Sequence, residues 1–579
     1  MKSKKHFFTA ALLLTFGCAI IGKQVLAGGD NFSYDDIIRL EKVINKISEF
    51  YVEEIHSKEL VEASIEGLRT ILDPHTAYFS EKEYNNLKVS TEGAFGGLGI
   101  TIAIRDNILT IISPLQGTPA FRMGLQAGDK IIEIEGESTK GITVDKAVEK
   151  LRGKPKTAVT ITVYREGVDE PLEFTIIRDI IRIKSVPFAS MLNDSTGYVK
   201  VTQFSKRTSK DLREKVETLK KKGATSLILD LRNNPGGLLN QAIDVSNIFL
   251  DKKLLVVYTK GRTRSQNKEY FSKDEPVWDS SHRVFVLVNE GSASASEIVA
   301  GAIQDHDRGI IMGKPTFGKG SVQTILPLDA QKYALKLTTA YYYTPSGRCI
   351  NKIENAAKAT REEEAHRDST KKDSSYFFTD SGRKVFAAGG ITPDVDIEGN
   401  LYNSYIRELE RKTMFFKFII KNRPKLEKQS DINYTYEVPE SLRKTFKEYI
   451  YSDTNFTKFK SASHVMLDKF SETLEKEREA LGDTLKDKLN SEIDLLKKNL
   501  DEILAQKTKT QFEQNIDYIN YGLKRELLQA VKGDSLSHLI AISRDKQIEE
   551  ALVYINKPEL YIKALTDKNS KRKKEEKPK

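Results

Sequence analysis

Three short apolar segments separated by helical patterns constrain the fold of this chain more than any other feature. They consist almost entirely of Val, Ile, Leu and Phe, and they lie at Ser226–Leu231, Arg283–Val288 and Ile310–Met312. Such runs are typical of strands that are buried on both faces of a sheet. Helical patterns alternate with them, at Lys210–Lys221, Ala242–Phe249 and Ala295–Gln304. The alternation predicts an α/β unit over residues 179–400, with helices packed on a sheet.

The rest of the chain differs from this unit in its pattern of apolar, glycine and charged residues. At roughly 150 residues per domain, 579 residues suggest about four folded units. Residues 28–89 have apolar positions at helical spacing and predict a helical N-terminal region, which breaks at Leu72-Asp73-Pro74. Residues 90–178 contain short β-rich runs between Gly and Asp turns, with a single helical pattern at Val144–Leu151. Within the α/β unit, the charged residues 354–375 predict a surface insertion.

Residues 401–565 predict a long helical extension. Apolar residues from Leu474 to Ile503 recur at intervals of three, four or seven and form one stripe. That stripe requires burial in an intrachain bundle, in a homodimer or against an adaptor protein, and the sequence leaves these open. Residues 566–579 form a basic tail that holds part of the net charge of +10. Because no folded basic face is apparent, we expect no nucleic-acid binding.

Residues 1–27 are typical of a secretory signal peptide. Lysines precede an apolar run from Phe7 to Ile21, and a small-residue cleavage pattern ends at Ala27. We therefore expect an exported protein, periplasmic in a bacterium. A retained segment, or a lipid on Cys18, would instead attach the N-terminus to the membrane. After signal removal only Cys349 remains, which excludes an intrachain disulfide and indicates a packing residue.

A serine at a predicted strand-to-helix junction is the best candidate for chemistry. Ser294 lies among small residues, just before the helix that begins near Ala295, where unpaired N–H groups would meet an oxyanion. Lys319 follows 25 positions later, between two glycines and with no acidic residue nearby. A lysine can take the serine proton only if its pKa falls from about 10.4 to roughly 7 or 8, which burial favours.

These segments resemble the C-terminal processing (tail-specific) serine proteases, which use a Ser-Lys dyad. The resemblance covers about residues 35–400 and rests on Leu72-Asp73-Pro74, Asp230-Leu231-Arg232-Asn233-Asn234-Pro235-Gly236-Gly237, Gly291-Ser292-Ala293-Ser294-Ala295-Ser296-Glu297, Gly318-Lys319-Gly320 with Gln323, and Gly390-Ile391-Thr392-Pro393-Asp394. It implies that Ser294 is the nucleophile, Lys319 the general base and Gln323 the residue that orients the base. It also implies an oxyanion hole formed by the backbone of Gly236, Gly237 and Ala295.

Residues 90–178 resemble a PDZ domain. The resemblance rests on the loop Gly96-Gly97-Leu98-Gly99-Ile100 and on two later segments, Gly117-Thr118-Pro119-Ala120 and Gly124-Leu125-Gln126-Ala127-Gly128-Asp129. In that family the loop presents N–H groups to the terminal carboxylate of a peptide, and the next strand pairs with the peptide backbone. The resemblance implies peptide binding by Gly97, Leu98, Gly99 and Ile100, and partners that are proteins or peptides with free C-termini. The other interpretation is a plain glycine turn.

The sequence as a whole predicts an exported serine endopeptidase that needs no metal or cofactor. The rival hypothesis is a catalytically inactive PDZ scaffold or peptide-binding adaptor, against which the presence of both Ser294 and Lys319 argues. Residues Gly313 to Lys319 match the phosphate-binding loop motif, but the next residue is Gly320, where that motif requires Ser or Thr. The polar run Asp305-His306-Asp307 is expected to end a helix and not to serve a Ser-His-Asp triad.

Overall fold

The structure is a computed structural model that describes residues 34–329, 332–352, 376–386, 389–427, 432–453, 456, 462–479, 495, 498–500, 502–503 and 510–566. The predicted signal peptide, the charged insertion, the basic tail after residue 566 and most of the apolar stripe lie outside the described residues. The chain divides into two compact units. The first contains Met1–Tyr84 and Gln323–Thr338, and the second contains Asn85–Val322 and Thr339–Lys579.

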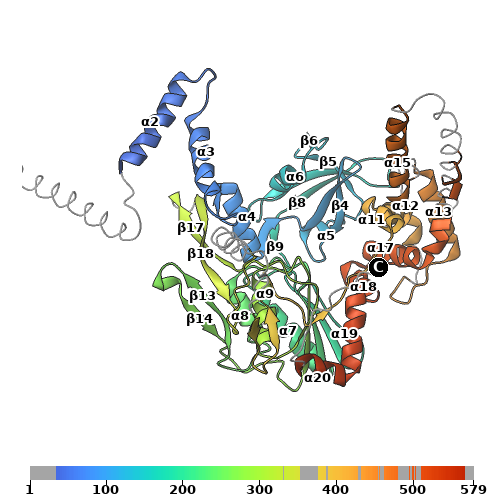
Figure 1. The fold of residues 1–579 in the computed structure, drawn as a ribbon. Helices are drawn as coiled ribbons and strands as arrows, with labels where there is room; N and C mark the ends of the chain where they lie inside the picture. Colours follow the sequence, from blue (N-terminus) through green and yellow to red (C-terminus); the bar gives the residue numbers. More distant parts are fainter. Residues whose placement is uncertain are drawn as a thin grey trace, which may run out of the picture. The chain divides into compact units, whose positions relative to one another are not determined.

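The first unit contains the predicted N-terminal helices, α2 (Tyr34–Phe50) and α3 (Ser57–Thr70) (Figure 1). After α3 the carboxylate of Asp73 accepts hydrogen bonds from the His75 N–H and the Thr76 hydroxyl, both 2.8 Å long, which stabilises the expected turn. A strand that the sequence analysis missed follows, β1 (Ala77–Phe79), and it pairs with β18 (Tyr333–Tyr343). Strand β18 also pairs with β17 (Ser321–Leu328), and α4 (Glu81–Glu92) leads into the second unit.

The second unit begins with a small β-rich module. Its main sheet has the order β3-β4-β5-β7-β8, and β6 adds to β5. The bounds of these strands are Ile100–Arg105, Ile108–Pro114, Lys130–Ile134, Ala158–Tyr164, Leu172–Ile177 and, for β6, Glu137–Ser138. A separate pair joins β2 (Ala94–Gly97) to β9 (Asp179–Arg182). Helix α6 (Val144–Leu151) has the predicted bounds, and the one-turn helix α5 (Pro119–Arg122) was not predicted.

A six-stranded sheet forms the centre of the α/β region, with the order β10-β11-β12-β15-β16-β21. All neighbours are parallel except β10 and β11. The strands span Phe188–Met191, Thr196–Lys200, Ser226–Asp230, Arg283–Val288, Ile310–Gly313 and Val395–Asp396. The three apolar segments are therefore adjacent central strands, which confirms the predicted α/β architecture.

Both faces of this sheet are buried, which explains the unbroken apolar runs. On β12, Leu227 and Leu229 belong to one core, and Ile228 on the opposite face belongs to another. The first face is covered by α7 (Thr208–Lys221), α8 (Leu239–Ser246) and α9 (Ala295–Asp305). The second is covered by the last two helices of the described residues, α19 (Lys546–Asn556) and α20 (Pro558–Thr566) (Figure 1).

Smaller elements complete the α/β region. β13 (Leu255–Gly261) pairs with β14 (Lys268–Phe271) and with the last residues of β18, and η1 (Arg264–Gln266) joins β13 to β14. β19 (Tyr376–Phe378) and β20 (Lys384–Phe386) form a hairpin. Helix α9 ends at Asp305, as predicted from the polar run, and Asp305 forms a buried ion pair with Arg348.

The C-terminal extension is helical, as predicted, and has an apolar core of its own. Its helices are α11 (Ser404–Arg411), α12 (Met414–Leu426), α13 (Glu440–Ser452), α15 (Ala462–Glu479), α17 (Ile516–Lys532) and α18 (Asp534–Ile542). Helix α12 contacts the β-rich module, because Lys417 pairs with Asp106 at 2.7 Å. No helix in the described part of the chain is both long and apolar enough to cross a membrane.

Candidate active site

Three loops that carry predicted site residues meet at one edge of the six-stranded sheet. β12, β15 and β16 are parallel neighbours, so their carboxyl ends lie side by side. The loop after β12, residues 231–238, carries Gly236 and Gly237 and is called the glycine loop. The loop after β15, residues 289–294, carries Ser294 and is called the serine loop. The loop after β16, residues 314–320, carries Lys319 and is called the lysine loop. The order of strands in the sheet therefore gathers residues that are far apart in sequence.

Ser294 adopts an unusual backbone conformation at the start of α9. It is the N-cap residue, and its φ of +54° and ψ of −111° lie outside the regions that serine ordinarily adopts. Such strain is found at functional sites, where the surrounding structure holds it in place. Here the Ser294 N–H donates to Glu297 Oε2 at 2.7 Å, and Glu297 is the third residue of the helix. The side chain of Ser294 is half-buried.

The carboxylate of Glu297 joins the serine loop to the lysine loop. The oxygen that accepts from Ser294 also accepts from the Lys319 N–H, at 2.9 Å. The other oxygen accepts from the Thr316 hydroxyl at 2.6 Å and from the Gly318 N–H at 2.8 Å. Burial raises the pKa of the fully buried Glu297, and these four donors oppose that rise. The backbone nitrogens of Ser294 and Lys319 thus share a single carboxylate oxygen.

Lys319 is less buried than the sequence analysis expected. The residue is half-buried, and Pro315 and Phe317 of the same loop are exposed. The Phe317 N–H donates to the Ser292 carbonyl at 3.0 Å, a second link between the two loops. Gly318 has a φ of +87°, and a Cβ at Gly320 would lie 2.5 Å from the Asn351 nitrogen, so both flanking glycines are required by the backbone.

The glycine loop packs directly against the serine. A Cβ at Gly236 would lie 2.9 Å from Ser294 Cβ and 2.9 Å from the Ala295 nitrogen. The Gly236 N–H is already bonded to Asn234 Oδ1, at 2.9 Å. Within the described chain, the N–H groups of Gly237 and Ala295 have no hydrogen-bond acceptor. Of the two predicted glycines, only Gly237 therefore offers a free donor.

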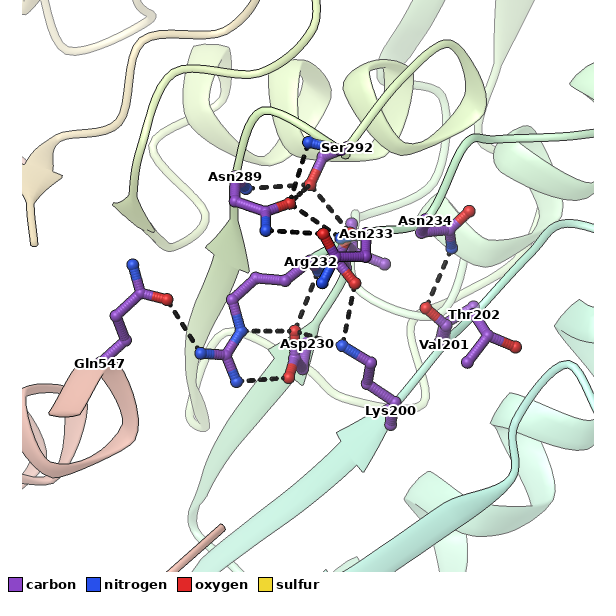
Figure 2. A network of polar contacts seen from close by, with 12 residues as sticks. Lys200, Val201, Thr202, Asp230, Arg232, Asn233, Asn234, Asn289, Ser292 and Gln547 are labelled. Atoms are coloured by element: carbon purple, nitrogen blue, oxygen red, sulfur yellow. Dashed lines mark hydrogen bonds and ion pairs between the residues drawn. The ribbon is translucent and has the colours of Figure 1, made fainter. Parts of the chain in front are cut away.

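A polar network holds the glycine loop at its base (Figure 2). Asp230 is only 1% exposed, and its carboxylate accepts two hydrogen bonds from Arg232. Nε of Arg232 donates to Oδ1 at 3.0 Å, and Nη2 donates to Oδ2 at 2.7 Å. Lys200 lies 3.0 Å from the same carboxylate. Burial acts to raise the pKa of Asp230, but Arg232 and Lys200 outweigh it and hold that pKa well below its usual range. Asn233 and Asn289 exchange hydrogen bonds, which tie the glycine loop to the serine loop.

Tyr342 is a neighbour of the serine that sequence reasoning missed. It is 6% exposed, and its N–H donates to the Gly320 carbonyl, next to Lys319, at 2.6 Å. Burial raises the pKa of Tyr342, and an interaction with the Ser294 hydroxyl opposes the rise. The phenol is therefore uncharged at neutral pH. Because Tyr342 comes from β18, no local sequence pattern connects it with Ser294.

Gln323 lies in the first compact unit, whereas Ser294 and Lys319 lie in the second. Its side-chain amide donates to the Thr338 hydroxyl at 3.2 Å. The role of Gln323 in orienting a base stays a prediction.

The predicted peptide-binding loop adjoins an edge strand. The Leu98 side chain is 2% exposed and packs in the core of the β-rich module, while its carbonyl accepts from Ala120. Among the described residues, the N–H groups of Leu98 and Gly99 have no acceptor. Ile100 begins β3, which is the edge of its sheet, and Gly97 pairs with Asp179 in the β2–β9 pair. An unpaired edge next to free N–H groups is the arrangement that strand addition by a peptide requires.

In the region that the structure describes, no group of three or more His, Cys, Asp or Glu side chains is arranged to hold a metal ion.

Comparisons with known proteins match both the α/β region and the β-rich module. A model described as "Peptidase family S41" matches residues 195–358, and one described as "PDZ domain" matches residues 87–164. The "Carboxy-terminal-processing protease" of Bartonella bacilliformis is 40% identical over 357 residues, which cover 61% of this chain and 81% of that protein. The "Carboxy-terminal processing protease CtpA" of Bacillus subtilis is 33% identical over 380 residues, which cover 65% and 79%.

A "Carboxyl-terminal-processing protease" of Synechocystis is 38% identical over 303 residues, covering 51% of this chain and 69% of that protein. The first two relatives are matched over more than three quarters of their own length. The chain therefore belongs to peptidase family S41, with the carboxy-terminal-processing proteases, and it carries a PDZ domain ahead of its protease core.

Proposed function

We propose that this protease is an exported serine endopeptidase in which Ser294 is the nucleophile, Lys319 is the general base and the PDZ domain captures free C-terminal tails. The observation that carries the proposal is the oxygen of Glu297 that accepts from both the Ser294 and the Lys319 backbone. This shared acceptor brings the backbone nitrogens of two residues 25 positions apart next to each other, which supports placing their side chains within reach. Nucleophile and base need such proximity for direct proton transfer.

Acylation begins when the Ser294 hydroxyl attacks the carbonyl carbon of the scissile peptide. Its proton passes to the neutral amine of Lys319, and the carbonyl oxygen becomes an oxyanion. The free N–H groups of Gly237 and Ala295 are the donors for that oxyanion, and Ala295 opens α9, whose N-terminus favours negative charge. The Lys319 ammonium then gives its proton to the leaving amine, and an ester remains on Ser294.

Deacylation repeats the same proton path with water in place of serine. Water attacks the ester carbon, Lys319 takes a proton from it, and that proton returns to the Ser294 oxygen as the ester bond breaks. The products are two shorter peptides, and both side chains regain their starting states. Because only a neutral amine accepts a proton, the rate should rise with pH through the pKa of the base.

The PDZ domain supplies the preference for tails. The N–H groups of Leu98 and Gly99 would bind the substrate carboxylate, and the edge of β3 would pair with the residues before it. Amidating the C-terminus of a peptide substrate should therefore raise its KM. An unchanged KM would exclude carboxylate capture.

Export rests on the pattern of residues 1–27 and predicts that the mature protein begins after Ala27. N-terminal sequencing of protein recovered from the periplasm of the producing bacterium tests this. A chain that stays in the cytoplasm with Met1 intact would contradict it.

The dyad is tested with Ser294→Ala and Lys319→Ala, assayed on a peptide with a free apolar C-terminus. Both variants should lose cleavage and keep peptide binding, as measured by fluorescence anisotropy. Lys210→Ala, on the exposed face of α7, is a matched control that removes a lysine outside the site and should cleave normally. Cleavage that persists in pure Ser294→Ala or Lys319→Ala would refute the assignment.

A further inference from the structure

The start of α19 contacts the base of the glycine loop, although the two lie more than 300 positions apart in sequence. Nη1 of Arg232 donates to Asp545 Oδ1 at 2.9 Å and to Gln547 Oε1 at 2.8 Å. Figure 2 shows the guanidinium of Arg232 between Asp230 on one side and Gln547 on the other. Arg232 is therefore held from both directions.

The α19 side of this contact is itself firmly placed. The Asp545 carboxylate caps the helix by accepting from the N–H groups of Gln547 and Ile548, at 3.0 and 3.2 Å. The Gln547 side chain is 4% exposed, and its amide nitrogen donates to the Ile397 carbonyl, just after β21, at 2.8 Å. Ile548 packs in the core on the second face of the sheet. The helix thus offers Arg232 a fixed pair of acceptors.

The loop beyond Arg232 leads within five residues to the predicted oxyanion donor. Asn233 is bonded to Asn289 of the serine loop, at 2.8 and 2.9 Å. Asn234 then accepts from Ala293 at 3.0 Å and holds the Gly236 N–H. A shift of Arg232 would pass through these bonds to Gly237. Catalytic geometry is sensitive to such shifts, since displacement by about 1 Å can lower a rate on the order of a hundredfold.

We infer that Asp545 and Gln547 are positioning residues for the oxyanion hole: they act through Arg232 and touch no substrate. The inference rests on the proposed function and deepens it, because it gives α19 a part in catalysis. It predicts that loosening the α19 contact lowers kcat and leaves KM unchanged, since the substrate tail binds elsewhere.

The test variant is Asp545→Ser, which keeps a hydroxyl to cap α19 and is too short to reach Arg232. Its matched control is Glu549→Gln, which removes an exposed carboxylate from the same first turn of α19. We expect kcat of Asp545→Ser to fall by a factor of about ten or somewhat more. This loss should be smaller than the loss on the order of a hundredfold to a thousandfold that follows when an oxyanion donor is removed outright. KM should stay within about twofold in both variants, and Glu549→Gln should turn over as the wild type does.

A peptide aldehyde separates this role from a general loss of structure. Its adduct with Ser294 carries an oxygen in the oxyanion position, so its affinity should fall in parallel with kcat/KM, while binding of the unmodified peptide stays constant. Asp545→Ser with wild-type kcat and wild-type aldehyde affinity would overturn the inference. Equal losses of aldehyde and plain-peptide binding would overturn it as well, because they indicate general disruption.

A second variant guards against misfolding of the first. Gln547→Glu keeps an acceptor for Arg232 and removes the donor to Ile397, so it should retain more activity than Gln547→Ala. Equal kcat values for these two would count against the role of Arg232. Ser294→Ala in the same assay separates the proposed function from the inference. If turnover does not depend on Ser294, both the proposed function and the inference are refuted. If turnover depends on Ser294 but kcat is unchanged in Asp545→Ser, only the inference is refuted.

Discussion

Replacing Glu297 by glutamine should loosen the serine loop from the lysine loop. Each oxygen of Glu297 accepts two hydrogen bonds from donors that cannot accept in return, apart from the Thr316 hydroxyl. An amide has one oxygen and one NH₂ group, so two of the four donors lose their acceptor whichever way the side chain turns. The backbone of Ser294 or of Gly318 must then shift to avoid the NH₂ group.

The magnitude follows from those two lost bonds. A hydrogen bond to a charged group contributes about 1.5–3 kcal/mol, so two of them amount to about 3–6 kcal/mol of folding free energy, and the Thr316 hydroxyl recovers part of this where it turns to accept from the NH₂ group. An amide is easier to bury than a carboxylate whose pKa is raised by burial, so the net loss should fall near the lower end. Movement of the proposed nucleophile and base should lower kcat on the order of a hundredfold.

Urea unfolding and steady-state cleavage of a tail peptide measure the two effects. Asp394→Asn is the control, because Asp394 is also a buried carboxylate, but it accepts from Arg383, Gln304 and the Ile311 N–H of β16 and from no residue of the three loops. It should lose stability but keep kcat per folded molecule. If Glu297→Gln cleaved within twofold of the wild type, the carboxylate would not hold the proposed dyad together and the reasoning would be refuted.

Three further predictions test other contacts of the site. Gly236→Ala should lower kcat on the order of a hundredfold, because its Cβ would meet Ala293 oxygen at 2.6 Å, whereas Gly136→Ala, also at positive φ but with open space, should leave kcat unchanged; equal effects would contradict the steric argument. Asp230→Asn should destabilise the protein at neutral pH; since the folded pKa of Asp230 is depressed, its contribution is complete above about pH 3.9 and disappears as pH falls toward the folded value, so in urea unfolding the wild type should lose more stability than the variant between pH 4 and pH 2. Tyr342→Phe should lower kcat by a constant factor of about three to ten up to pH 10, because the raised pKa keeps the phenol protonated; a fall in the wild-type rate near pH 10 that is absent from the variant would show that the phenol ionises.

The central strands and helices could be predicted from sequence because both sheet faces are buried, which leaves unbroken apolar runs such as Arg283–Val288. Ser294 was predictable for a related reason, since a small residue between a buried strand and a helix marks a strand-to-helix turn. The contacts that assemble the site were not. Glu297 lies one turn from the serine, but nothing in its surroundings shows that it also binds the Lys319 loop. The partners Arg232 and Asp545 are too far apart for any periodicity to connect them.

The position of α19 and α20 at the end of the protease core matters during synthesis of the chain. The ribosome makes Ser294 about 250 residues before these helices, a delay on the order of ten to fifty seconds at the usual pace of synthesis. During that time the strands of the protease core have an uncovered apolar face, and Arg232 lacks its distant acceptors. If Asp545 and Gln547 position the oxyanion hole as inferred, a nascent chain should reach its full rate of cleavage only after α19 has been made.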